Sequence, residues 1–83
     1  MSRIDLRTLS VLWAWRNRLE NSVNRYSSPY TMEWLVMVES ALKWVEEGGA
    51  LDDRLVRNAL WAIKMYGGSA GERSVESLTE HPQ

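Results

Sequence analysis

The sequence contains no cysteine and no phenylalanine, and its single histidine, His81, stands close to the C-terminus. Without cysteine the chain has no disulfide framework, no thiolate zinc site and no cysteine nucleophile. A Ser-His-Asp triad or a histidine-ligated metal would depend on His81 alone. We therefore expect a protein that is not an enzyme and that carries no cofactor or metal.

Long apolar runs are also missing. No stretch approaches the roughly 20 apolar residues that cross a bilayer, and the N-terminus lacks the charged-then-apolar pattern of a signal peptide. The sequence therefore predicts a cytoplasmic protein with no membrane partner.

What is present describes one small domain. The chain has 83 residues, of which 45% are hydrophobic and 25% charged, a composition typical of a globular protein. A chain of this size buries only roughly 60% of the surface that its unfolded form exposes, so a second copy sharing the core would add stability. We expect a helical domain over residues 1–78, a disordered tail over residues 79–83, and a possible homodimer.

Three helices are predicted from caps and breaks. Ser2, with Asp5 three residues later, has capping-box spacing and favours a first helix from near Arg3 to Val23. Proline breaks the chain between residues 24 and 30, so the second helix begins at Pro29, or slightly later with Thr31 as its cap, and runs to Glu47. Asp52 or Asp53 caps the third helix, which Gly67 and Gly68 end. The spacing of Ser69 and Glu72 allows a short fourth helix around Val75 and Leu78.

Apolar residues at helical period mark one core-facing stripe on each helix. The stripes comprise Leu6, Leu9, Leu12, Trp13, Leu19 and Val23; then Trp34, Leu35, Val38, Ala41, Leu42 and Val45; then Leu55, Val56, Ala59, Leu60, Ala62, Ile63 and Tyr66. The first helix has a second apolar sector at Ile4, Val11 and Trp15, and Met37 and Trp44 lie at the margin of the second stripe. The predicted fold is all-α, a three-helix bundle or a dimerising helical hairpin.

Charge is unevenly distributed along the chain. Residues 1–26 hold five arginines against Asp5 and Glu20, whereas residues 27–50 hold Lys43 against four glutamates. The formal net charge of −1 weighs against duplex binding, because neutralised phosphates supply most of the non-specific affinity of DNA-binding domains. A local basic patch of Arg54, Arg57, Lys64 and Arg73 is the alternative nucleic-acid site.

Tryptophan is in surplus, with five Trp and three Tyr. Both side chains carry a polar atom and are enriched where a surface contacts a partner. The leading candidate partner-binding surface is Trp61 with Met65, one helical turn apart on the predicted wet face. Its flanking residues are Arg54, Arg57, Asn58 and Lys64. Trp15 with Val11 is a second candidate, for which a core role is the equal alternative.

Two motifs carry a family resemblance. Leu12-Trp13-Ala14-Trp15-Arg16, followed by Arg25-Tyr26-Ser27-Ser28-Pro29, resembles the N-terminal part of the phage antitermination protein Q family. Val38–Leu42 and Tyr66–Ser69 fall where such proteins enter a sigma-like helix-turn-helix. Family members then continue through two helices, the second of which contacts the major groove, whereas this chain has room for about one. The resemblance implies a phage setting and a transcription-linked partner, in a truncated form to which no DNA-contacting residue carries over.

The sequence supports two functional hypotheses. In the first, the chain is a non-catalytic protein-protein interaction module, a phage-derived regulator or inhibitor that docks on a larger bacterial complex and occludes a functional surface. The complex would belong to the transcription machinery or to host defence. In the alternative, the third helix and the segment from Ser69 to Leu78 form a small helix-turn-helix-like DNA-binding transcription regulator or antiterminator. A third interpretation assigns the exposed rings to a homodimer.

Overall fold

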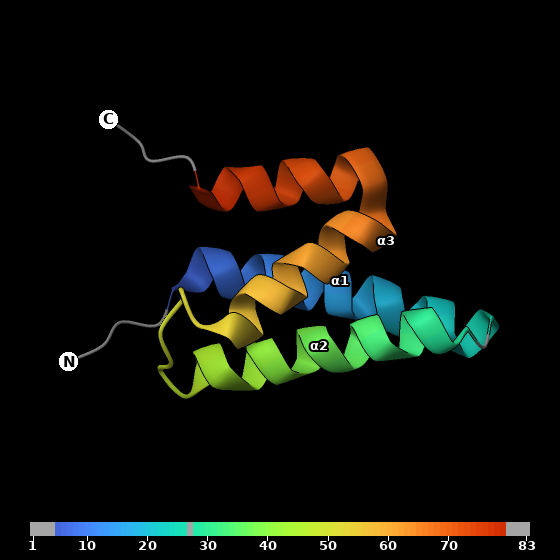
Figure 1. The fold of residues 1–83 in the computed structure, drawn as a ribbon, viewed down its shortest axis with the longest axis horizontal. Coiled ribbons are helices and arrows are strands. Elements are labelled where there is room, and N and C mark those ends of the chain that lie inside the picture. The colour runs from blue at the N-terminus through green and yellow to red at the C-terminus, as the bar shows by residue number, and fades with distance from the viewer. Residues whose placement is uncertain (1–4, 27, 80–83) are drawn as a thin grey trace.

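The computed structural model describes residues 5–26 and 28–79, and it contains three helices (Figure 1). They are α1 (Leu6–Arg25), α2 (Pro29–Glu46) and α3 (Arg54–Thr79). α1 and α2 run in opposite directions, and α2 packs against both α1 and α3. The predicted all-α three-helix bundle is confirmed, and no strand forms in the part of the chain that is described.

α1 begins later than the sequence predicted. Asp5 is extended, with φ −83° and ψ 102°, and its Oδ1 accepts hydrogen bonds from the backbone N–H groups of Arg7, at 3.0 Å, and Thr8, at 3.3 Å. Asp5 is therefore the N-cap itself and not the residue at position N3 of a capping box that starts at Ser2. Its carboxylate accepts hydrogen bonds from two of the first backbone N–H groups, which have no partner within the helix. Ser2, Arg3 and Ile4 lie outside the described residues.

A glycine and a tryptophan side chain shape the loop between α2 and α3. α2 starts as predicted with Ser28 at the cap and Pro29 in its first turn, while Ser27 lies outside the described residues. At its end Gly48, with φ 86°, supplies the left-handed conformation that glycine enters without penalty. The Nε1–H of Trp44 then donates to the carbonyl of Ala50 at 2.8 Å, which ties the loop back onto α2.

α3 begins as predicted, and its first helical segment ends at the predicted glycine pair. The carboxylate of Asp53 accepts from the backbone N–H of Leu55 at 2.9 Å, so Asp53 caps the helix. Gly68 then turns the chain with φ 56° and ψ −130°, and the helix resumes at once. The first segment of α3, residues 54–67, and its second segment, residues 69–79, run in opposite directions (Figure 1).

The second segment is the short fourth helix that the sequence allowed around Val75 and Leu78. Its Val75 is buried in the common core, so the segment is anchored by packing. The helix continues to Thr79, one residue past the predicted domain boundary, and residues 80–83 lie outside the described part of the chain. Gly71 permits this packing, because a Cβ at this position would overlap the backbone carbonyl oxygen of Ile63.

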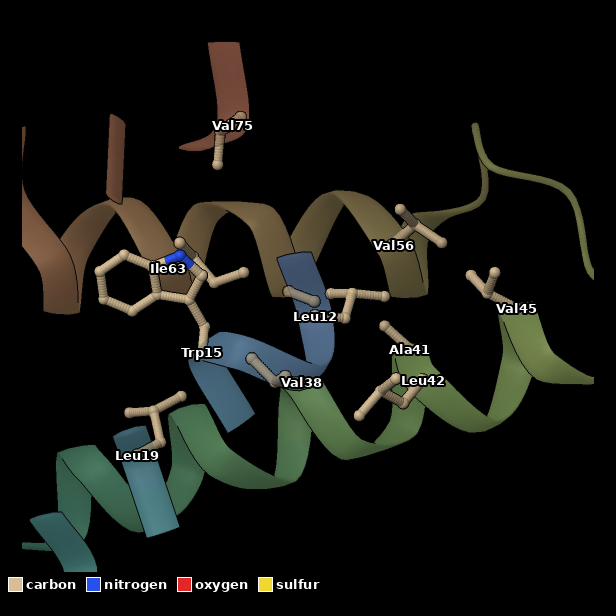
Figure 2. Close-up of a cluster of buried hydrophobic side chains, with 11 residues drawn as sticks. Leu12, Trp15, Leu19, Val38, Ala41, Leu42, Val45, Val56, Ile63 and Val75 are labelled. Carbon is tan, nitrogen blue, oxygen red and sulfur yellow. The ribbon is translucent and has the colours of Figure 1, made fainter. Parts of the chain in front are cut away.

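The core is one cluster with contributions from all three helices (Figure 2). Its buried apolar side chains are Leu12, Trp15, Leu19, Val38, Ala41, Leu42, Val45, Val56, Ala59, Ile63 and Val75. Three predicted core positions are wrong, since Leu6, Trp13 and Leu55 are exposed. On α1 the buried side runs through Thr8, Leu12, Trp15 and Leu19, a stripe rotated away from Trp13 because Trp15 packs against Tyr66 and Gly67 of α3.

Replacing Gly71 by alanine tests the seating of the second segment. We expect Gly71→Ala to lower the free energy of unfolding by about 1–3 kcal/mol, because the new methyl group meets a backbone carbonyl that cannot rotate away. In an unhindered helix the same change stabilises by about 0.5–1 kcal/mol. Urea denaturation followed by circular dichroism measures the difference.

The matched control is Glu72→Ala, an exposed position in the same segment, where the change should stay within about 0.5 kcal/mol. A Gly71→Ala protein at least as stable as the wild type would contradict the described contact with Ile63.

Candidate functional site

The Trp61 face is a single stripe on the first segment of α3. Arg54, Asn58, Trp61 and Met65 are spaced so that each lies about one turn from the next, and all four are exposed. Trp61 keeps 51% of its surface accessible and Met65 keeps 55%. The prediction that this ring and this thioether lie on the outer side of the helix is confirmed.

Basic side chains border the Trp61 face on one edge. Arg57 precedes Trp61 by four residues and Lys64 follows it by three, so both neighbour the indole along the helix, and both are exposed. Within the described residues, the cation–π contacts involve Trp13 and Trp15, not Trp61. Arg73, the fourth residue of the predicted basic patch, lies on the second segment beyond the turn at Gly68, so the four cations do not share one helical stripe.

Trp15 is a core residue, which settles the alternative left open by the sequence. Only 4% of its surface is accessible. Its ring stands edge to face with Tyr66, with the centroids 6.1 Å apart, and a Cβ on Gly67 would overlap the indole. Val11 is half-buried against the same core. Trp15 and Val11 therefore do not form a partner-binding surface.

Tyr66 joins the aromatic residues of three helices. Besides Trp15 on α1, it contacts Trp34 on α2 with ring centroids 6.3 Å apart. Its hydroxyl also lies 3.5 Å from the carbonyl oxygen of Arg18, at the limit of a hydrogen bond. Buried indoles thus account for part of the tryptophan surplus, while Trp13 and Trp61 remain largely outside.

A groove that the sequence pattern did not identify opens between the C-terminal half of α1 and the turn of α3. It encloses about 600 Å³ and is lined by Trp15, Arg18, Asn21, Ser22, Arg25, Tyr26, Tyr66, Gly67 and Ala70. We call it the α1–α3 groove. One signal was present in the sequence, because Arg18, Asn21, Ser22 and Arg25 have the spacing of one helix face. Its opposite wall comes from Tyr66 and Gly67 at the end of the first segment of α3 and from Ala70 after the turn.

The acidic side chains of the described residues do not cluster. Within residues 5–26 and 28–79, no three His, Asp or Glu side chains gather as ligands for a cation. His81 lies outside these ranges. Glu39 forms an ion pair across the α1–α2 junction, since its Oε2 lies 3.3 Å from the guanidinium of Arg16. No helix in the described part of the chain is both long and apolar enough to traverse a bilayer.

Comparison with known proteins gives no match. No protein-family model fits the sequence, and neither the curated proteins nor the solved structures include one that is significantly similar to it. Functional inference therefore rests on the residues and their geometry.

The two neighbouring tryptophans of α1 should respond differently to truncation. Trp15→Ala should destabilise the protein by about 3–5 kcal/mol, because it empties the space between α1 and the turn of α3. Trp13→Ala should cost about 1 kcal/mol, since Trp13 is 43% exposed and its clearest contact is the guanidinium of Arg16, 5.4 Å from the ring centroid. Urea unfolding midpoints compare the two, and equal losses would contradict the assigned burial.

Proposed function

We propose that this chain is a non-catalytic protein-binding module that docks through the Trp61 face on a larger bacterial complex and occludes a functional surface of that complex. A phage-derived regulator or inhibitor acting on transcription machinery or on host defence fits this role. The observation that carries the proposal is the half-exposed indole of Trp61, held in one stripe with Met65 on a rigid helix.

The residue types of the Trp61 face support a binding role. Tryptophan, methionine and arginine are enriched at interface centres, and tryptophan and arginine dominate energetic hot spots. Trp61 exposes a large ring that no core contact requires, because Ala62 and Ile63 supply the buried positions at that level of α3. Insertion of this ring into an apolar pocket would recover the hydrophobic free energy that the isolated chain forgoes.

The positive charge around Trp61 indicates the kind of surface that it would bind. The Trp61 face itself contains Arg54 and the neutral Asn58, and Arg57 and Lys64 border it on one edge. The complementary surface is an apolar pocket rimmed by carboxylates, since matched potentials steer association and exclude wrong partners. A second copy of the chain is the competing occupant, because exposed Met32 and Val36 on α2 lie among glutamates.

The DNA-binding alternative receives less support from the geometry. A helix-turn-helix uses a turn of three or four residues and leaves its second helix free to enter the major groove. Here the break is at Gly68 alone, and the second segment places Val75 in the core and Gly71 against Ile63. The proposal of a protein partner is therefore preferred.

Loss of the indole is the direct test. Tagged wild type, Trp61→Ala and Trp13→Ala are used to capture proteins from a bacterial lysate, and each captured complex is then purified and titrated. Trp61→Ala should raise the Kd by about 30-fold, the equivalent of roughly 2 kcal/mol for a hot spot. Trp13→Ala, which removes another exposed indole of the chain, should leave the Kd within about twofold.

Two results would overturn the proposal. One is a purified complex that binds wild type and Trp61→Ala with the same Kd. The other is sedimentation that shows a wild-type dimer dissociated by Trp61→Ala, because the face would then be the interface between two copies of this chain.

A further inference from the structure

The α1–α3 groove has one wall made of hydrogen-bond donors. Arg18, Asn21, Ser22 and Arg25 lie along one side of α1, and all four line the groove. Arginine offers five N–H donors in a planar fork that matches phosphate and carboxylate oxygens. Among the residues that the structure describes, the lining contains no acidic side chain. The wall is therefore suited to an anion.

The positive charge of this wall is not neutralised within the described chain. Arg16 pairs with Glu20 at 2.8 Å and with Glu39 at 3.3 Å, on the side of α1 that faces α2. Helical spacing places Arg18 and Arg25 on the other side, and neither forms an ion pair among residues 5–26 and 28–79. Glu20, the acidic residue of α1 nearest to the groove, therefore pairs with Arg16. The guanidinium groups of Arg18 and Arg25 are left at the groove without a carboxylate partner among the described residues.

The rest of the groove lining includes three aromatic side chains. The guanidinium carbon of Arg18 lies 4.4 Å from the ring centroid of buried Trp15, a cation–π contact that favours this position of the guanidinium. Tyr66 lines the groove from α3, and Tyr26 at the end of α1 is 71% exposed. Aromatic rings and guanidinium planes are the surfaces on which unpaired bases stack.

The lining also distinguishes a nucleotide from a peptide. Its single aliphatic side chain is Ala70, so the groove has no pocket for the apolar side chains of an acidic peptide. Its volume of about 600 Å³ falls within the roughly 300–1,000 Å³ typical of small-molecule sites. A base in a duplex has both faces covered, whereas a free nucleotide or a single strand offers a ring and a phosphate together.

We propose that the α1–α3 groove binds a nucleotide unit, with its phosphate on Arg18 and Arg25 and its base against Tyr26. The unit belongs to single-stranded nucleic acid or to a free mononucleotide. This site does not depend on the proposed docking function, because the groove and the Trp61 face share no residue.

Fluorescence anisotropy with a labelled single-stranded RNA of about ten nucleotides tests the site. The variant Arg18→Gln/Arg25→Gln should weaken binding at least tenfold and reduce the slope of log K against log salt by about 0.7, the value for one neutralised phosphate on a single strand. Tyr26→Ala should weaken binding by roughly tenfold with an unchanged slope, because stacking carries no charge. Circular dichroism verifies that each variant is folded.

The matched control is Arg57→Gln/Lys64→Gln, which removes the same charge from the Trp61 face. It should change the affinity by less than about twofold. An equal loss in this control would show diffuse attraction to the surface and would overturn the proposal.

Competition distinguishes the sources of the ligand. Adenosine monophosphate, inorganic phosphate and an acidic peptide are titrated against the bound RNA. Stronger binding of RNA than of the mononucleotide identifies a strand as the ligand, and equal binding identifies a free nucleotide; both support the proposal. Inorganic phosphate as effective as the mononucleotide, an acidic peptide that binds more tightly, or no binding of any probe would each overturn it.

Discussion

The contact between Trp15 and the turn of α3 is the constraint on which the arrangement depends. The indole lies inside the bundle with Tyr66 at its edge, and only a residue without a Cβ fits at Gly67. Because Gly68 reverses the chain immediately afterwards, this contact fixes where the second segment begins. A small domain buries limited surface, so a large ring shared by several elements contributes a substantial part of the cohesion.

The contact between Trp15 and the turn of α3 also determines the surface at the α1–α3 groove. With Trp15 held in place, the guanidinium of Arg18 contacts the buried ring, and Tyr66 and Ala70 line the α1–α3 groove opposite it. An ordered guanidinium loses less rotamer entropy on binding than a mobile one. The hydrophobic core therefore preorganises the polar groove beside it.

The two proposed surfaces differ in how they depend on tertiary structure. The Trp61 face belongs to one helical segment, so any arrangement that leaves that side of α3 uncovered presents it. The α1–α3 groove needs α1 and the turn of α3 to lie side by side, since its lining comes from both. Substitutions that loosen the turn would affect the groove more than the Trp61 face, although both surfaces lie on the same small bundle.

Local rules determined much of this protein. Proline at the start of α2 and an aspartate before α3 act through neighbouring backbone groups, so the sequence alone placed these boundaries, the second to within one residue. The exposure of Trp61 and Met65 could also be predicted from helical period, since their stripe is opposite the apolar one.

Tertiary structure decided which tryptophan of α1 is buried and which direction the chain takes after Gly68. Trp13 and Trp15 both border apolar sectors, and only the position of the neighbouring helices makes Trp15 the core residue. A glycine pair satisfies either a helix end or a sharp reversal, and burial of Val75 selects the reversal. Contacts between residues far apart in the chain carry no local periodic signal, and for that physical reason the groove became visible only in the folded protein.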